Sequence, residues 1–459
     1  MATGTNVNDR RSWTPLASLL VILVVGSASG CRCGGSTGES ELRVEGGERM
    51  ARPTRPDESR RARRRRAVGR RGSRQLAARF SHRPTLFVGE RLKCARMRER
   101  LVAAGAQVRL PTTFRLPALK SDTALISFVQ HRRKLYRFVR WRGRTRRLRA
   151  LPLANVDPLL IGLRDELEFG KLDMRTLQVY LGRAYDRLLA DAVPPKAKRL
   201  LFAPDGLARF VPLHALLARA SGSRGATARQ FVVSRAAIAY LPCAALAVGS
   251  SRPLSTLTLI APSYGRGRAR KPLAGAHEEL KAIMKQARRL GLPAARYVGT
   301  EATPKRLLAA LEARGRLVHF AGHGLADLRP GSPPELIFPG RDEGLSVQLL
   351  TRSPARASMA VLASCAGAYV ARFRDDQRLL AKVNLAEALL GAGTGTVIAA
   401  SWSVKDRQSA AQMRLFYRDL QRLGAARALA AAQRERIARL RPPHPRFWAF
   451  YAVYGDPGW

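Results

Sequence analysis

Two short apolar segments of the chain each end near a residue that could take part in nucleophilic catalysis. Residues 317–324 read Leu-Val-His-Phe-Ala-Gly-His-Gly and contain His323. Residues 359–367 read Met-Ala-Val-Leu-Ala-Ser-Cys-Ala-Gly and contain Cys365. Both segments are typical of buried parallel strands, and open α/β sheets place ligands outside the carboxyl ends of such strands. If the two strands are neighbours, His323 and Cys365 emerge side by side, as a Cys–His nucleophile requires.

Each of these residues also has a structural interpretation. A cysteine at the end of an apolar strand usually belongs to the core, and a loop histidine is often bonded to the backbone. Gly322 and Gly324 flank His323 and leave room for a substrate backbone, and the neighbours of Cys365 are small, which favours the catalytic interpretation. We expect a structural role for His319, because its spacing from His323 does not suit shared metal ligation on a strand.

The elements that must position these residues follow from the hydrophobic pattern. The chain has 459 residues, enough for one large α/β unit or for two or three domains. From residue 199 onward it alternates between strand-like and helix-like segments, which predicts a mostly parallel sheet. Strands are expected over residues 199–203, 238–241, 256–261, 317–324, 359–365 and 395–402, and helices over 276–290, 303–314, 384–391 and, as one long stretch, 407–440. Upstream, a helix over 92–104 and strands over 123–129, 135–141 and 148–153 precede one helix over 161–190.

The N-terminus has the architecture of a targeting sequence. Arg10 and Arg11 precede an apolar run over residues 16–25, and small residues over 26–30 come directly before Cys31. This pattern resembles a bacterial lipoprotein signal, in which Cys31 is lipidated, although Ala28 stands where leucine is usual. A cleaved secreted protein and an uncleaved single-span anchor are alternatives, but the apolar run is short for a span. We therefore expect a lipoprotein anchored to a membrane of the cell envelope.

Residues 31–83 predict a disordered, basic N-terminal tether. They are rich in Gly, Ser, Pro and Arg and show almost no apolar periodicity. An arginine-rich run over 60–71 could be a nucleic-acid arm or a solvated linker. No aromatic residues interleave with it, which disfavours base stacking, and after a signal sequence it is expected to lie against an anionic membrane. The net charge of +49 favours anionic partners in general, but a codon bias towards arginine explains it equally well, and nucleic acid is not expected as a partner.

The five cysteines do not predict a metal site. They are Cys31, Cys33, Cys94, Cys243 and Cys365, and no Cys-x-x-Cys pair or Cys/His spacing typical of zinc occurs among them. We predict no metal and no cofactor. The sequence leaves open whether Cys94 and Cys243 form a disulfide.

Several motifs together resemble the CHAT domain, a family of caspase- and separase-related cysteine peptidases of clan CD. His319-Phe-Ala-Gly-His323-Gly is similar to the histidine motif of the family. Leu362-Ala-Ser-Cys365-Ala-Gly is similar to its cysteine motif, which often reads Leu-Ser-Ala-Cys-Glu-Thr-Gly. The segments over 122–128, 203–214, 384–406 and 444–458 also fit the family pattern. The tetratricopeptide repeats that often precede the domain are absent from the sequence.

The resemblance implies a division of the chain and a fold. Residues 1–30 are expected to be the signal, 31–83 the linker, 84–194 the N-terminal part of the CHAT region and 195–459 the peptidase domain. The expected fold is a caspase-like, mostly parallel sheet flanked by helices and preceded by a small β-containing region. The expected function is a cysteine endopeptidase that hydrolyses peptide bonds in a protein substrate. A catalytically inactive scaffold that mediates protein interactions at the envelope is the alternative.

The resemblance also implies roles for individual residues. Cys365 is the nucleophile and His323 the general base and acid. The N–H groups of Gly324 and Cys365 are candidate oxyanion-hole donors. Asp205 and Asp406 lie in loops and could form a specificity pocket for a basic residue before the cleaved bond, although turn or cap chemistry is the favoured interpretation of both.

Overall fold

The computed structural model describes residues 72–458, with gaps at 107, 111–113, 171, 220–228, 248–252, 263–272, 326–333, 340–343, 353, 366 and 369–382. The predicted signal sequence, Cys31 and the arginine-rich run over 60–71 lie outside the described residues. No helix in the described part of the chain is long and apolar enough to cross a membrane.

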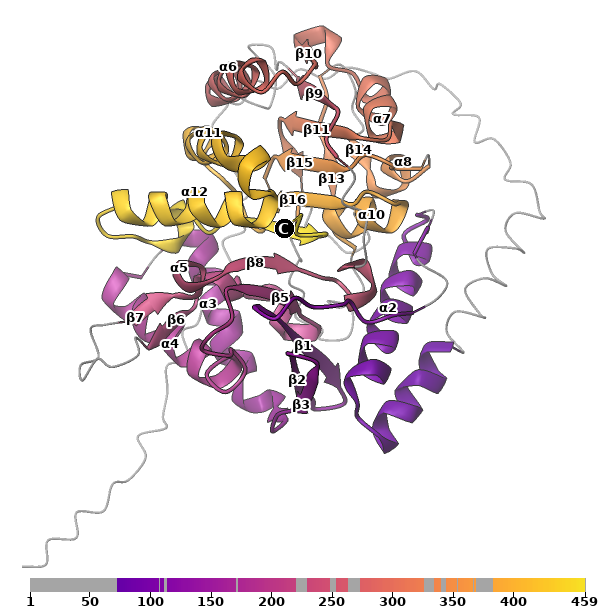
Figure 1. Cartoon of the computed structure of the whole chain (residues 1–459), viewed down its shortest axis with the longest axis vertical. Helices are drawn as coiled ribbons and strands as arrows, with labels where there is room; N and C mark the ends of the chain where they lie inside the picture. The colour runs from indigo at the N-terminus through magenta and orange to yellow at the C-terminus, as the bar shows by residue number, and fades with distance from the viewer. Residues whose placement is uncertain are drawn as a thin grey trace, which may run out of the picture. The chain divides into compact units, whose positions relative to one another are not determined.

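One large sheet organises the described part of the chain (Figure 1). Its strands are β1 (Thr123–His131), β2 (Lys134–Trp141), β3 (Arg144–Arg147), β4 (Leu151–Pro152), β5 (Arg199–Ala203), β8 (Ala237–Tyr240), β9 (Thr256–Ala261), β10 (Ala294–Val298), β11 (Arg316–Ala321), β15 (Met359–Ala363), β16 (Thr396–Ala400) and β17 (Tyr451–Gly455). Their order is β10-β9-β11-β15-β16-β17-β8-β5-β1-β2-β3, and β4 pairs with β2. Two small sheets pair β6 (Leu217–Arg219) with β7 (Arg229–Phe231), and β12 (Gly324–Leu325), β13 (Glu335–Leu336) and β14 (Leu345–Ser346) with one another.

The large sheet consists of two parallel blocks that run in opposite directions. Strands β10, β9, β11, β15 and β16 are parallel to one another, and so are β17, β8, β5 and β1. The blocks meet at the antiparallel pair β16–β17. The central strands are buried on both faces, as parallel strands covered by helices must be. The predicted α/β fold with a mostly parallel sheet flanked by helices is therefore confirmed.

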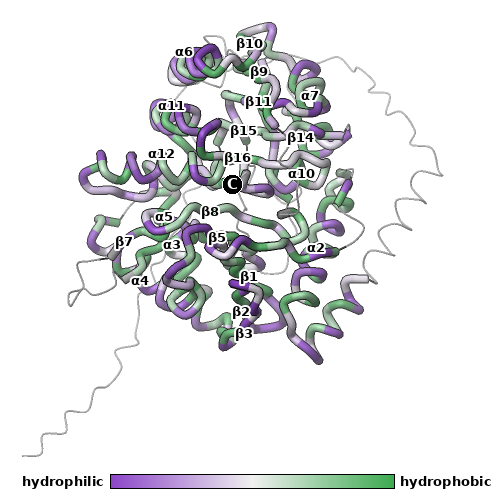
Figure 2. Tube along the Cα trace, in the orientation of Figure 1, coloured by the Kyte–Doolittle hydropathy of each residue, from purple (hydrophilic) through white to green (hydrophobic). Residues whose placement is uncertain are grey.

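Helices cover both faces of this sheet. The helices α6 (Ala274–Arg289), α11 (Asp406–Leu423) and α12 (Ala425–Arg439) lie on one face, and α2 (Leu86–Ala103), α7 (Pro304–Glu312), α8 (Val347–Leu350) and α10 (Leu385–Ala392) on the other (Figure 1). The remaining helices are α3 (Asp157–Phe169), α4 (Met174–Leu188) and α5 (Val232–Arg235). Figure 2 shows alternating hydrophobic and hydrophilic residues along α6 and α11, as expected for helices with one face on the core.

Two long helices expected from the sequence are each interrupted by a glycine. The segment predicted as one helix over 161–190 forms α3 and α4, and α3 ends where Gly170 adopts a φ of 64°. The segment over 407–440 forms α11 and α12, separated at Gly424 with a φ of 75°. A positive φ ends a right-handed helix, and glycine adopts it without a Cβ clash. The strand expected over 148–153 is wrong in its bounds, since only β4 (Leu151–Pro152) forms within it and β3 (Arg144–Arg147) precedes it.

The predicted disordered tether over 31–83 ends earlier than expected, because residues 72–82 form a helix. The ring of Phe80 in this helix is fully buried and packs edge-on against Tyr136 and Phe138 of β2, with centroid distances of 5.1 and 6.3 Å. The hydrophobic pattern did not predict this helix, because a single aromatic residue in an arginine-rich segment produces no apolar periodicity. The prediction of disorder was therefore wrong for residues 72–82.

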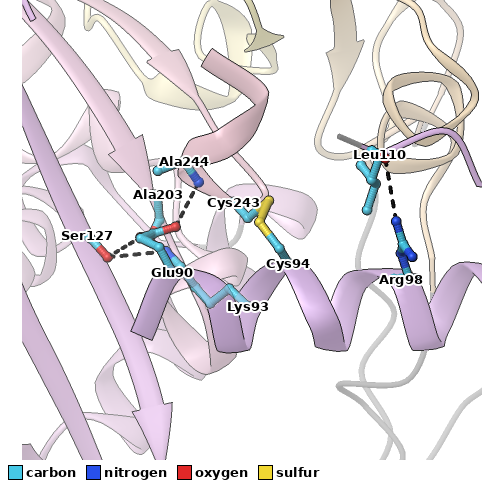
Figure 3. Close-up of a disulfide and its surroundings, with 9 residues drawn as sticks. All are labelled: Glu90, Lys93, Cys94, Arg98, Leu110, Ser127, Ala203, Cys243 and Ala244. Atoms are coloured by element: carbon cyan, nitrogen blue, oxygen red, sulfur yellow. Dashed lines mark hydrogen bonds and ion pairs between the residues drawn. A yellow bond between two sulfur atoms is a disulfide. The ribbon is translucent and has the colours of Figure 1, made fainter. Parts of the chain in front are cut away.

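A disulfide and the hydrogen bonds of a buried ion pair within α2 attach this helix to the block that contains β5 and β8 (Figure 3). Cys94 of α2 is bonded to Cys243, which follows β8, and this answers the question that the sequence left open. Beside the disulfide, Glu90 and Lys93 form a fully buried ion pair of 2.5 Å. Lys93 Nζ also donates to the carbonyl oxygen of Ala203 at 2.6 Å. Both charges are thus compensated inside the protein, as buried charges must be.

Candidate functional site

The pairing of β11 with β15 brings together the segments that contain His323 and Cys365. The two strands are parallel, and Ala321 lies opposite Ala363 at their carboxyl ends. The N–H of Gly322 donates to the carbonyl oxygen of Ala363 at 3.3 Å, which continues the pairing beyond the strands. His323 and Cys365 each follow two residues after the paired alanines, on strands about 4.8 Å apart. The expectation that the two strands are neighbours is confirmed.

The Cys365 thiol lies near the loop that connects β16 to α11. Its Sγ donates to the carbonyl oxygen of Val404 at 3.7 Å, and the residue is half-buried. Cys365 is the one cysteine of the described residues that is not in a disulfide. A half-buried thiol at a strand end can meet a substrate, whereas a fully buried one cannot.

Gly324 packs directly against the cysteine segment. A Cβ atom at this position would collide with the carbonyl oxygen of Cys365 and would lie 3.1 Å from Ser364 Oγ. The Ile337 N–H donates to the carbonyl of His323 at 3.0 Å, so the opposed pair Gly324 and Leu336 is a non-hydrogen-bonded pair of the β12–β13 ladder. In such a pair the N–H points away from the partner strand. The absence of a side chain therefore lets the two segments meet, and the Gly324 N–H is directed away from β13.

His319 lies within β11 and is fully buried in a polar network. Its Nδ1 lies 2.9 Å from the hydroxyl of Tyr417 on α11, and its Nε2 lies 2.8 Å from Glu279 Oε1 on α6. Glu279 Oε2 accepts from Ser409 Oγ at 2.9 Å, and Ser409 is 2.9 Å from the hydroxyl of Tyr451. The network joins β11, α6, α11 and β17 across one face of the sheet. It supports the structural role that the sequence favoured for His319.

The two tyrosines of this network stay protonated. Burial raises the pKa of both Tyr417 and Tyr451 well above its usual value, and the nearby carboxylate of Glu279 raises it further. This role of Glu279 was not predicted from the sequence. The one sequence feature that could have indicated this pairing is the presence of Glu279 and His319 at otherwise apolar positions of a predicted helix and a predicted strand.

Asp205 is not brought to Cys365 by the structure. It follows β5, and three strands lie between β5 and β15 in the sheet. Because the two blocks run in opposite directions, β5 and β15 also end at opposite edges. Asp205 Oδ2 accepts from the Gln130 N–H at 3.0 Å and pairs with Arg96 at 3.1 Å. Its contacts are those of a residue that fixes a turn.

Asp406 lies closer to the cysteine. It is the first residue of α11 and comes two residues after Val404, whose carbonyl accepts from the Cys365 thiol. The carboxylate of Asp406 accepts from the N–H of Gly275 at the start of α6. Asp406 therefore stabilises the N-terminus of α6 with a charge of the favourable sign, and it stays near the candidate site.

The fold and the site define an α/β protein with a cysteine and a histidine at the ends of neighbouring parallel strands. The family model of the CHAT domain matches residues 178–456, which is more than half of the chain. The chain belongs to the CHAT domain family. The match begins within α4, upstream of the boundary expected at residue 195, and the large sheet includes strands from both sides of that boundary.

Two solved structures are similar to this chain. One is the Saccharomyces cerevisiae separase–securin complex, with 10% identity, a TM-score of 0.48 and coverage of 73% of this chain and 30% of that chain. Another is the Arg-specific cysteine proteinase gingipain R, with 13% identity, a TM-score of 0.38 and coverage of 66% and 76%. Both TM-scores lie below 0.5, so the family assignment rests on the family model. No curated protein matches the chain.

Proposed function

We propose that this protein is a cysteine endopeptidase in which Cys365 and His323 form the catalytic dyad. The observation that supports the proposal is the in-register parallel pairing of β11 with β15, because the carboxyl ends of both strands, which His323 and Cys365 follow, lie at the same edge of the sheet. Family membership supports it, since the chain retains a histidine and a cysteine at the positions that the resemblance implies.

The proposed reaction has two steps. His323 takes the proton of the Cys365 thiol, and the thiolate attacks the carbonyl carbon of the scissile peptide bond. The C–N bond then breaks, the amine leaves with the proton from His323, and a thioester to Cys365 forms. In the second step His323 takes a proton from water, and the hydroxide attacks the thioester carbonyl carbon. The C–S bond breaks, the carboxylic acid product leaves, and His323 returns its proton to the Cys365 thiolate. General acid–base catalysis of this kind contributes about 10²–10⁴-fold.

The groups around the dyad have supporting roles in this proposal. The N–H groups of Gly324 and Cys365 would donate to the oxygen that becomes negative in the tetrahedral intermediate. Asp406 is the better supported of the two candidate specificity residues, since it follows the loop that contacts the thiol. The contacts of Asp205 give no support to a role in the same pocket.

The second candidate function is an inactive scaffold for protein interactions. The observation that favours it is the cysteine motif itself, in which Ala366 and Gly367 follow Cys365 where the family often has Glu-Thr-Gly. A scaffold would keep the fold and the surface of a peptidase without a reactive thiol.

For the cellular location we propose the cell envelope, with Cys31 lipidated and attached to a membrane. The disulfide between Cys94 and Cys243 supports an oxidising compartment, since structural disulfides are rare in the cytosol. Such a compartment also exposes a thiolate to oxidation, and the half-burial of Cys365 would limit that reaction. Mass spectrometry of the mature N-terminus tests this location. A diacylated Cys31 is expected, and an intact Met1 would contradict it.

The catalytic proposal is tested with an electrophilic peptide probe that alkylates active-site thiols. We expect labelling of Cys365 in the native protein and at least tenfold slower labelling in His323→Ala, because the imidazole no longer takes the thiol proton. The matched control is His82→Ala, since His82 is exposed and lies on the 72–82 helix. Equal labelling of Cys365 in all three proteins would favour the scaffold over the peptidase.

A further inference from the structure

A small cavity with arginines in its wall lies where the two parallel blocks meet. Its volume is about 40 Å³. The wall includes residues of α3, α10, β8 and β17 and of the segments that follow β5 and β16, and among its polar residues are Arg164, Arg209, Tyr240, Asn384, Glu387 and Ser401. His323 and Cys365 are not part of the wall. The cavity is therefore separate from the proposed dyad.

The buried charges beside this cavity do not balance. Arg209 Nη2 lies 2.5 Å from Glu387 Oε1, and Arg100 Nη2 lies 3.4 Å from the same oxygen. The three side chains are 8%, 13% and 4% exposed, in the order Arg209, Arg100 and Glu387. Two guanidinium groups thus share one carboxylate, and this group carries one more positive than negative charge. An uncompensated buried charge costs several kcal/mol, so a further anion would stabilise the group.

Three buried polar atoms of this group have no hydrogen-bond partner among the described residues: the donors Arg209 Nη1 and Arg100 Nε and the acceptor Glu387 Oε2. Burial lowers the pKa of Arg100, and the positive charge of the nearby Arg209 lowers it further. The neighbouring His214 adds no charge at neutral pH, because burial lowers its pKa to about 4. The positive charge at the cavity wall therefore belongs to arginines.

Water alone does not satisfy this arrangement. A volume of 40 Å³ exceeds the roughly 10–15 Å³ that one water needs, so the cavity has room for a small polar group. Water would accept from Arg209 Nη1 but would leave the charge uncompensated. A carboxylate or phosphate oxygen supplies both the acceptor and the charge, and guanidinium groups bind such oxyanions with short, charge-assisted hydrogen bonds.

We propose that this cavity is a binding site for an oxyanion, held by Arg209 and supported by Arg100. The oxyanion is either the carboxylate of an acidic side chain on a bound polypeptide or a free phosphate. Glu387 competes with the ligand for the same guanidinium groups, so its charge sets the affinity of the site. The proposal does not depend on peptidase activity, because the dyad residues take no part in it.

The test is a phosphate titration of the purified chain, with ionic strength held constant by sodium chloride and binding followed by calorimetry. Constant ionic strength is needed because a net charge of +49 attracts anions non-specifically. We expect saturable binding at one site and a Kd at least about tenfold higher in Arg209→Met. Glu387→Gln is expected to lower the Kd, since it removes the competing charge and keeps the shape. Arg422→Met, at a surface ion pair, is the matched control and should leave the Kd unchanged.

The Kd for phosphate is expected to rise in Arg209→Met and to fall in Glu387→Gln, so the proposal can be tested even if one of the two variants folds poorly. A structural role for the cluster would weaken binding in both. Absence of saturable phosphate binding and of acidic-peptide binding, or an equal Kd in Arg209→Met, would overturn the proposal. A glutamate-rich peptide that displaces phosphate identifies the acidic side chain as the ligand. Phosphate binding that the peptide does not displace identifies free phosphate.

Discussion

The two parallel blocks of the sheet use ionisable side chains in different ways. In the block with β11 and β15, His323 and Cys365 are half-buried at strand ends and their neighbours are small. In the block with β5 and β8, Glu90 and Lys93 are fully buried, paired with each other and placed beside a disulfide. Groups that are paired and enclosed hold elements together, whereas groups that are left accessible can react. The accessible groups of the proposed dyad thus lie at strand ends of the first block, and the ion pair next to the second block is enclosed.

The same contrast occurs within one strand segment. His319 is fully buried between Glu279 and Tyr417, while His323, four residues later, leaves the sheet and is half-buried. The first histidine joins β11 to two helices and has no access to solvent. The second has access to solvent, and its neighbour Gly324 packs directly against the backbone of Cys365.

The largest expected effect on stability is in the second block. Lys93→Met should lower the free energy of unfolding by about 3–5 kcal/mol, because it leaves the buried carboxylate of Glu90 without its cation. Urea denaturation followed by circular dichroism measures the change. The double variant Glu90→Gln with Lys93→Met removes both charges and should recover part of the loss. A loss below about 1 kcal/mol in the single variant would show that this block does not depend on its ion pair.

The next effect is a pH dependence caused by His214. Burial lowers its pKa to about 4 from 6.5, and its Nε2 lies 2.9 Å from the carbonyl oxygen of Ala449. As the pH falls, His214 of the unfolded chain binds a proton before His214 of the folded chain does. The contribution of the neutral imidazole to the free energy of unfolding is therefore complete above about pH 6.5 and is lost as the pH falls to about 4. The difference of about 2.5 pKa units corresponds to roughly 3 kcal/mol. Denaturation curves between pH 4 and pH 7 should show this slope, and His214→Phe should show a smaller one.

The smallest effect is expected at the surface of α11. The Arg422 side chain is 72% exposed and lies 3.0 Å from Asp419, which Arg418 also contacts. Exposed pairs contribute about 0–1 kcal/mol, so Arg422→Ala should change the free energy of unfolding by less than about 1 kcal/mol. If Arg422→Ala lowers the free energy of unfolding as much as Lys93→Met does, the contribution of an ion pair in this protein does not depend on its burial.

Local sequence patterns located the strands that carry the dyad. The strands over 199–203 and 256–261 have the bounds that the sequence predicted, because apolar runs are bounded there by turn residues. The adjacency of β11 and β15 also follows from the sequence, since consecutive strands of such folds usually neighbour each other. The candidate dyad was accessible to this reasoning because both its residues end an apolar run.

Features set by long-range contacts were not accessible. The strands β10 and β17 were not expected, and the reversal between β16 and β17 depends on pairing of strands distant in sequence. That reversal is the reason why Asp205 and Cys365 lie at opposite edges. The buried pairing of Glu279 with His319 was missed for a similar cause, since it needs α6 and β11 to be packed together.

The most direct test of the account is the pH dependence of Cys365 alkylation by iodoacetamide. Thiolate is the reactive form, and a thiol paired with a histidine ionises below the usual value of about 8.5. The account predicts that the alkylation rate constant of the native protein reaches half of its maximum value at a pH below about 7.5. In His323→Ala this midpoint should shift upward to about 8.5. Identical profiles for the two proteins, both with a midpoint at or above about 8.5, would contradict the proposed dyad.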